Sequence, residues 1–257
     1  MARLGLKIWS TNRGYRASAR ALRAAGVFDF VEMTFPAESG LDDVAFWRNE
    51  PYPFVLHGPH SLCGLNLAVP GLEGENRAQL QRLDQARLIL QPERVVLHPG
   101  VDGTVEETIR QMVALRATLP DLFARALVEN KPQVGLRGER CVGASPEEVR
   151  AIRSATGLGF CFDIGHAICY ANAAARPWPP VIEEFLAMAP ALYHLSDGDA
   201  AALTDAHEHL GAGTFDLPRI IRRIPPDAAV CLETRKDSAT DLDDFARDVA
   251  YFRECAA

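Results

Sequence analysis

Short apolar runs alternate with longer amphipathic stretches along the chain, and eight of these runs have the length and composition of buried strands. They are residues 3–9, 27–33, 53–57, 94–98, 125–129, 159–163, 192–196 and 229–233. The stretches between them show helical spacing of apolar residues, at 15–26, 41–49, 75–91, 104–119, 145–156, 180–189, 216–224 and 240–254. Capping signals mark two helix starts, Thr104 with Glu107 and Ser145 with Glu148.

Eight strand–helix repeats, with no Gly/Ser linker or low-complexity tract between them, predict a single (β/α)8 barrel. We expect residues 1–257 to form one domain of this kind. An open doubly wound sheet is the alternative architecture. The glycine-rich dinucleotide fingerprint that would favour it does not follow the first strand.

The amino-acid composition argues against some classes of function. The chain is 48% hydrophobic and 24% charged, with a net charge of −7, which argues against a broad basic surface for nucleic acid. Its six cysteines form no CxxC pair, which is typical of reduced thiols. No stretch approaches the ~20 apolar residues of a membrane span, and no secretion signal is apparent. We therefore expect a cytoplasmic protein with no membrane partner.

Histidines and carboxylates gather where the predicted strands end. Each histidine falls in a strand's last residues or in the following loop, and none in a predicted helix; the seven are His57, His60, His98, His166, His194, His207 and His209. Glu129, Asp163 and Glu233 also end strands, and Asp205 opens a loop. In a (β/α)8 barrel these ends share one face, so the pattern predicts a site for a divalent metal such as Zn²⁺ or Mn²⁺.

Several segments, in order, resemble the endonuclease IV and xylose isomerase-like barrel superfamily. They are LHGPHSLCGLNLA (56–68), VVLHPG (95–100), LVENK (127–131), CFDIGHA (161–167), YHLSDG (193–198), DAHEHLGAGTFD (205–216) and CLET (231–234). The first two strands and the helices match only generically.

The resemblance implies one to three divalent metal ions per chain. It assigns a core site to Glu129, Asp163, His194 and Glu233, a second site to His57, His98 and the bridging Glu129, and a third to His166, Asp205 and His207. Either His57 or His60 could be the third-strand ligand; His57 directly ends its strand and is preferred. The candidate substrate-binding residues are His60, Asn66, Lys131, Asp197 and Arg235.

The sequence departs from endonuclease IV at its DNA-binding elements. A tyrosine and a bulky aliphatic residue that wedge into DNA are expected after the third-strand histidine, where this chain has His60, Cys63 and Gly64. The arginine of the Asp-Arg-His loop is Ala206, and the loop at 34–43 is acidic. These departures make duplex DNA an unlikely partner and favour a small carbohydrate.

Two enzyme classes fit this pattern of histidines and carboxylates at the strand ends. The sequence alone does not indicate an oligomeric state. The first class is an isomerase or epimerase of sugars or sugar phosphates, in which Glu129 and Glu233, expected four strands apart, move a proton through a metal-stabilised enediolate. Either His166 or Arg235 would orient hydroxyls or a phosphate. The second is an endonuclease IV-like phosphodiesterase or a hydrolase of small phosphoesters. A metal-loaded binding protein is the non-enzymatic alternative.

Overall fold

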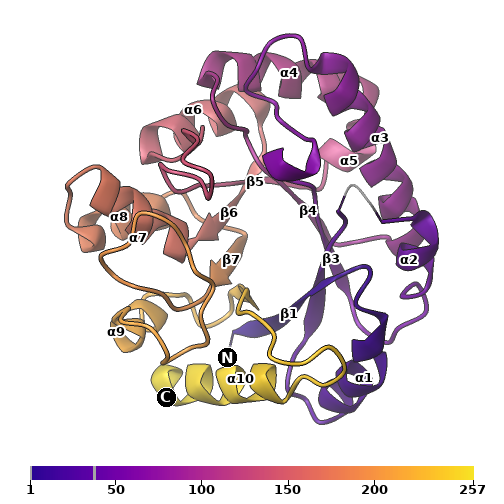
Figure 1. Ribbon diagram of the computed structural model, residues 1–257, viewed down its shortest axis with the longest axis vertical. Helices are drawn as coiled ribbons and strands as arrows, with labels where there is room; N and C mark the ends of the chain where they lie inside the picture. Colours follow the sequence, from indigo (N-terminus) through magenta and orange to yellow (C-terminus); the bar gives the residue numbers. More distant parts are fainter. Residues whose placement is uncertain (1, 37–38) are drawn as a thin grey trace.

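The computed structural model describes residues 2–36 and 39–257 and contains a closed barrel of eight parallel strands, each hydrogen-bonded to the next (Figure 1). The strands are β1 (Arg3–Trp9), β2 (Phe30–Thr34), β3 (Phe54–His57), β4 (Arg94–Leu97), β5 (Ala126–Glu129), β6 (Gly159–Asp163), β7 (Leu192–Leu195) and β8 (Ala229–Leu232). Pairing of β8 with β1 closes the barrel, which confirms the predicted (β/α)8 fold. Residues 37 and 38 of the acidic loop at 34–43 lie outside the described residues.

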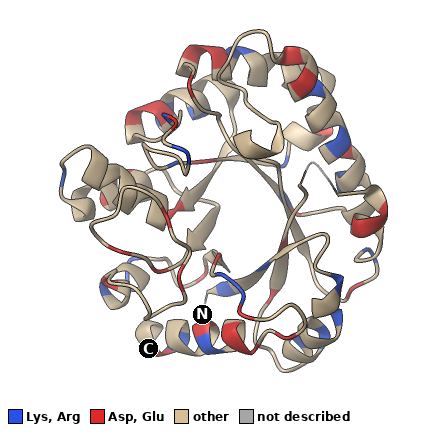
Figure 2. Cartoon of the chain, in the orientation of Figure 1, with Lys and Arg blue, Asp and Glu red and all other residues tan. Residues whose placement is uncertain are grey.

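Helices surround the barrel and carry much of its surface charge (Figures 1 and 2). They are α1 (Arg16–Ala24), α2 (Leu41–Ala45), α3 (Glu73–Leu90), α4 (Val105–Thr118), α5 (Pro120–Phe123), α6 (Pro146–Thr156), α7 (Ile164–Ala173), α8 (Trp178–Leu186), α9 (Leu217–Ile221) and α10 (Asp243–Ala256), with short 3-10 turns η1 (Arg13–Tyr15) and η2 (Ser61–Cys63). The hydroxyls of Thr104 and Ser145 accept hydrogen bonds from the backbone N–H groups of Glu107 and Glu148, as the capping signals predict.

Three elements differ clearly from the sequence prediction, and the first is the short helix α5, which was not predicted. Strand β2 begins at Phe30, three residues later than predicted, because Phe28 packs against Tyr52 and Phe245 before the strand starts. Helix α7 was not predicted, and it places His166 in its first turn, so the expectation that no histidine lies in a helix was wrong. Eight of the ten residues of α7 are buried, so the segment lacks the polar face that reveals a surface helix.

The barrel interior is built in layers with a period of two residues, because successive strand side chains point to opposite faces. The lower layer is an apolar plug of Phe30, Val55, Val96, Leu127, Cys161, Leu192 and Cys231. On β1 the corresponding position is Gly5, where a Cβ would lie 2.4 Å from the Phe30 ring. The layer two residues further along each strand is polar and forms the site described below.

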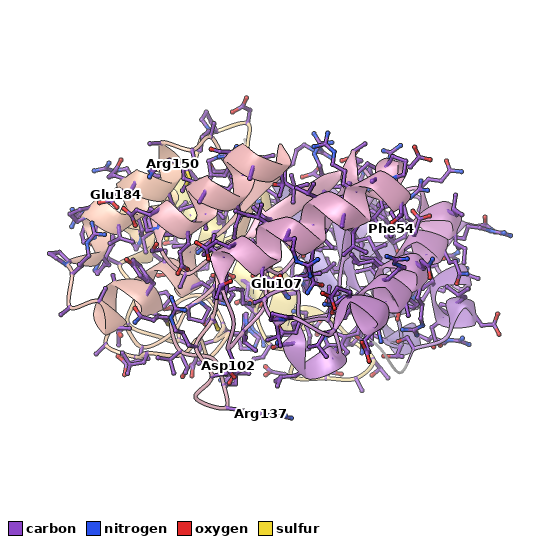
Figure 3. All side chains as sticks on the ribbon, turned by 90° about the horizontal axis from the view of Figure 1, so that it is seen from above. Phe54, Asp102, Glu107, Arg137, Arg150 and Glu184 are labelled. Carbon is purple, nitrogen blue, oxygen red and sulfur yellow. The ribbon has the colours of Figure 1, made fainter. Side chains whose placement is uncertain are left out.

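The loops that follow the strands cover one end of this barrel. In the side view of Figure 3, Asp102 and Arg137 lie in two of these loops, at the edge away from Phe54, the first residue of β3. The polar layer therefore opens toward the βα loops, at the face where (β/α)8 enzymes carry their active sites.

Candidate metal centre

Every strand contributes one titratable side chain to the polar layer. Two residues beyond the apolar plug come Lys7, Glu32, His57, His98, Glu129, Asp163, His194 and Glu233. Each is buried or nearly so. The cavity above them, about 530 Å³, is lined by loop residues and by five of the eight, Lys7, His57, His98, Glu129 and Glu233. A cavity of this size is in the range of small-molecule sites.

The four residues expected to form the core site converge on one atom, Nδ1 of His194. Glu233 Oε1 lies 2.9 Å from it, Glu129 Oε2 3.7 Å and Asp163 Oδ2 3.9 Å. The structure thus brings this quartet together. The two glutamates were expected four strands apart, but β5 and β8 are three positions apart around the barrel, with β6 and β7 between them.

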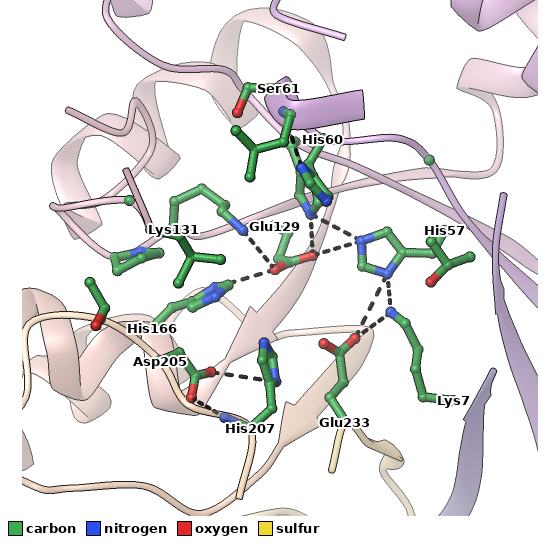
Figure 4. Close-up of a pocket in the computed structure, with 18 of the residues that line it drawn as sticks. Lys7, His57, His60, Ser61, Glu129, Lys131, His166, Asp205, His207 and Glu233 are labelled. Atoms are coloured by element: carbon green, nitrogen blue, oxygen red, sulfur yellow. Dashed lines mark hydrogen bonds and ion pairs between the residues drawn. The ribbon is translucent and has the colours of Figure 1, made fainter. Parts of the chain in front are cut away.

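The second group expected from the sequence also assembles. Glu129 Oε2 lies 3.4 Å from His57 Nε2 (Figure 4). It lies 3.0 Å from His98 Nε2, and the Nε2 atoms of His57 and His98 are 3.0 Å apart. His60 lies further out: its ring centroid is 6.1 Å from that of His98, and its Nδ1 accepts a hydrogen bond from the Leu62 backbone N–H. The geometry therefore favours His57 over His60 as the third-strand ligand.

The third group lies on the other side of Glu129. His166, Asp205 and His207 offer ligand atoms within 4.8 Å of one another, and His166 Nδ1 is 3.3 Å from Glu129 Oε1. Asp205 can approach helix α7 because residue 165 is glycine; a Cβ there would lie 2.8 Å from Asp205 Oδ2. The side chain of His207 is 41% exposed, so this group faces the cavity mouth.

Two polar residues of this layer, Lys7 and Glu32, were missed by the sequence prediction. They are register partners on β1 and β2, and Lys7 Nζ lies 2.7 Å from Glu32 Oε1 and 2.5 Å from Glu233 Oε1. Lys7 Nζ also contacts His57 Nδ1. Each interrupts an apolar strand, Lys7 between Leu6 and Ile8, and Glu32 between Val31 and Met33. A charged residue at an inward strand position is the signal that could have found them.

Opposite charges keep the three buried glutamates of this layer and the lysine ionised. Burial opposes ionisation, but the charges of His194 and Lys7 outweigh it and hold the pKa values of Glu233 and Glu32 below their usual range. Burial likewise opposes the charged form of Lys7, yet Glu233 and Glu32 raise its pKa. His98 and Lys131 lower the pKa of Glu129 against its burial.

The expected substrate-binding residues divide into two sets. His60, Lys131 and Arg235 line the cavity. Asn66 and Asp197 are not among the described residues that line it, because their side chains bind backbone instead. Asn66 Oδ1 accepts from the Val101 and Ala68 N–H groups, and the Asp197 carboxylate accepts from four backbone N–H groups, at Gly198, Gly211, Gly213 and Phe215. Both residues shape loops rather than face a substrate.

One further histidine, His209, also lies outside the described cavity lining. Its Nδ1 is 3.0 Å from Asp248 Oδ2 and its Nε2 is 3.1 Å from Asp237 Oδ1, so the ring ties the loop after β7 to the loop after β8 and to α10.

The donor set fits a divalent metal such as zinc or manganese. Imidazole and carboxylate are the ligands these ions take, and the structure groups them in overlapping sets of three or four. Within the described parts of the chain, the buried atoms His207 Nδ1 and Asp205 Oδ2 make no hydrogen bond. Buried polar atoms without partners are costly, and a cation at these positions would satisfy them.

Zinc affinity is expected to fall below pH 6. Burial raises the pKa of Asp163 to about 6, and the carboxylates of Asp205 and Glu129 act in the same direction. At pH 5 an incoming ion must displace the proton from this carboxyl group, whereas at pH 7 it need not. We expect affinity about tenfold lower at pH 5 than at pH 7 from this group alone, measured by competition with a zinc chelator. Equal affinity at both pH values would contradict the assignment of Asp163 as a ligand.

Comparison with known proteins defines the class to which this fold and site belong. Residues 19–255 match the family described as xylose isomerase-like TIM barrel, so the chain belongs to that family. Among curated proteins, none matches the chain. In the described residues, no helix is long and apolar enough to cross a membrane.

Solved structures of similar fold include proteins of both expected enzyme classes. A D-tagatose 3-epimerase-like protein superposes with a TM-score of 0.72 at 18% identity, over 98% of this chain and 96% of the other. Endonuclease IV from Thermus thermophilus gives 0.71 at 22% identity, over 98% and 99%. A further Thermus thermophilus protein, from a ZnCl₂ soak, gives 0.67 at 24% identity, over 96% and 97%. At these identities the likeness establishes the fold.

Proposed function

We propose that this protein is a divalent-metal-dependent isomerase or epimerase of a sugar or sugar phosphate. The observation that carries the proposal is the placement of two ionised glutamates, Glu129 and Glu233, around His194 Nδ1 at the base of a cavity of about 530 Å³. Two such carboxylates beside one bound substrate could each exchange a proton with it. Similarity to a D-tagatose 3-epimerase-like protein supports a carbohydrate substrate.

Under this proposal Glu129, Asp163, His194 and Glu233 would hold the core zinc or manganese ion. A bound divalent ion would polarise adjacent carbonyl and hydroxyl oxygens of the substrate. One ionised glutamate would accept the proton from the carbon beside the carbonyl and later release it to solvent, and the other would take up a proton from solvent and deliver it to the substrate. Because Glu129 and Glu233 both have lowered pKa values, each is in the ionised form that a base requires at neutral pH.

The cavity walls would bind the rest of the substrate. The ammonium groups of Lys7 and Lys131 lie beside Glu233 and Glu129 respectively, 2.5 Å and 3.6 Å away, where they can donate hydrogen bonds to sugar oxygens or a phosphate. His166 would orient a hydroxyl from the α7 side, and Arg235 and His60 would contact the outer part of the substrate. We propose that the chain forms a single domain and that this domain acts on small molecules.

A multinuclear phosphoesterase is the second candidate, and one observation favours it. The groups His57–His98–Glu129 and His166–Asp205–His207 both assemble, although an isomerase with a single metal ion does not need them. Similarity of fold to endonuclease IV is consistent with this candidate. Such a site would hold two or three ions and hydrolyse a phosphoester.

Metal analysis of the purified protein separates the two candidates. After removal of bound metal, the protein is titrated with Zn²⁺ and with Mn²⁺, and the equivalents bound per chain are counted by elemental analysis. One tight equivalent per chain supports the isomerase, and two or three support the hydrolase. Failure to bind either ion would contradict both.

Binding to duplex DNA with an abasic site is expected to be weak. The segment after His57 supplies His60, Cys63 and Gly64 rather than a tyrosine and a bulky aliphatic wedge, and the chain carries a net charge of −7. We expect a Kd no tighter than about 1 µM at physiological salt, as for non-specific binding, in a fluorescence anisotropy titration. Nanomolar binding to abasic duplex DNA, together with much weaker binding to intact duplex, would favour the endonuclease over the isomerase.

A further inference from the structure

Glu32 lies at the base of the candidate metal centre between two of its histidines, and its side chain is fully buried. Its two oxygens contact different rings: Oε1 is 2.8 Å from His57 Nδ1, and Oε2 is 3.0 Å from His194 Nε2. The two imidazoles are stacked, with ring centroids 5.6 Å apart and an interplanar angle of 28°. One carboxylate therefore touches both rings from the side away from the cavity.

The opposite nitrogen of each ring faces the candidate ligands. His57 Nε2 points toward His98 Nε2 and Glu129 Oε2, at 3.0 Å and 3.4 Å. His194 Nδ1 points toward Glu233, Glu129 and Asp163. An imidazole can bind a metal only through a nitrogen that has lost its proton, and an ionised carboxylate can only accept hydrogen bonds.

We propose that Glu32 is a positioning residue that fixes His57 and His194 in opposite tautomers, with the proton on Nδ1 of His57 and on Nε2 of His194. Each ring then donates its N–H to one oxygen of Glu32 and presents its lone pair to the metal centre. The inference rests on the proposed metal site and not on the reaction performed there.

The positive charge of Lys7 keeps the buried Glu32 carboxylate ionised, as the proposed positioning role requires. A buried carboxylate that receives two neutral N–H donors still needs a nearby cation, and Lys7 Nζ lies 2.7 Å from Glu32 Oε1. Lys7 Nζ also contacts His57 Nδ1, but in the proposed tautomer the proton at that nitrogen belongs to His57, so that two N–H groups of the ammonium go to Glu32 and Glu233 and none goes to the ring.

The remaining neighbour of the network is Cys161, whose Sγ is 3.2 Å from His194 Nε2. Burial raises the pKa of this thiol, so it stays neutral. A neutral thiol is a weaker acceptor than an ionised carboxylate, and the Nε2 proton of His194 therefore goes to Glu32.

The test replaces Glu32 by glutamine and by aspartate. Glutamine keeps the shape but offers one acceptor and one donor, so its NH₂ group must face one of the two ring N–H groups. Aspartate keeps the charge but is one methylene too short to reach both rings. The matched control is Glu50→Gln, which removes another buried carboxylate, paired with Arg16 and Arg20 away from the cavity.

We expect Glu32→Gln to lower zinc affinity about 10- to 100-fold, Glu32→Asp to lower it less, and Glu50→Gln to leave it unchanged. Imidazole ¹⁵N shifts of the zinc-loaded wild type should show His57 protonated at Nδ1 and His194 at Nε2. Thermal unfolding of each variant checks that the affinity change is not a loss of fold.

The outcomes separate this inference from the proposed function. A wild type that binds no zinc would overturn the metal site itself. A wild type that binds zinc, with unchanged affinity in a folded Glu32→Gln variant or with either imidazole in the other tautomer, would overturn only the role of Glu32.

Discussion

Replacing Glu129 by glutamine is expected to abolish turnover and to disrupt metal binding at more than one position. Glu129 Oε2 lies 3.0 Å from His98 Nε2 and 3.7 Å from His194 Nδ1, while Oε1 is 3.3 Å from His166 Nδ1. A neutral amide would both remove the proposed base and place an NH₂ group against imidazole nitrogens. We expect turnover to fall about 10³- to 10⁴-fold, which is the scale of a lost general base together with a weakened metal site.

The same Glu50→Gln variant serves as the control here, since it loses a buried carboxylate far from the cavity lining. Steady-state turnover and metal equivalents are measured on both proteins under identical metal concentrations. If Glu129→Gln kept wild-type metal content and turnover, Glu129 would be neither a ligand nor a base.

Replacing Glu233 by glutamine is expected to abolish turnover as well, but with a narrower effect on metal binding. Glu233 Oε1 contacts His194 Nδ1 at 2.9 Å and Lys7 Nζ at 2.5 Å, and the group His57–His98–Glu129 does not include it. We expect a loss of about 10³-fold in turnover and loss of the core ion only. The measurement compares metal equivalents in the Glu233→Gln and Glu129→Gln proteins.

A Glu233→Gln protein that lost every bound ion would show that the three groups are one cooperative centre rather than separable sites. Full retention of both metal and turnover would remove Glu233 from the proposed mechanism.

Most of the barrel could be predicted from sequence because its strands are short, apolar and bounded by polar turns. The failure at α7 has a physical cause: residues 164–173 are buried on nearly all sides, so no polar face marks a helix. The shifted start of β2 arises because Phe28 is as apolar as the strand but packs outside it, against Tyr52 and Phe245.

The candidate site was predictable where titratable residues end strands, as at His57, Glu129 and Asp163. Lys7 and Glu32 lie inside strands with apolar neighbours on both sides, where the strand signal conceals the inward-facing charge. Asn66 and Asp197 show the converse case, since neither is among the described residues that line the cavity. Polar residues in the loops after strands resemble site residues in sequence, yet only the structure reveals that backbone N–H groups occupy their oxygens.

Hydrogen–deuterium exchange at carbon tests the central proposal most directly. A panel of ketoses, aldoses and their phosphates is incubated in D₂O with the Zn²⁺- or Mn²⁺-loaded protein and analysed by mass spectrometry. Proton transfer by Glu129 and Glu233 predicts deuterium at the carbon beside the carbonyl, lost in either glutamine variant and less affected by His207→Ala, because His207 is not part of the core quartet. No exchange across the panel, together with release of phosphate or an alcohol from a phosphoester, would contradict the isomerase and establish a hydrolase.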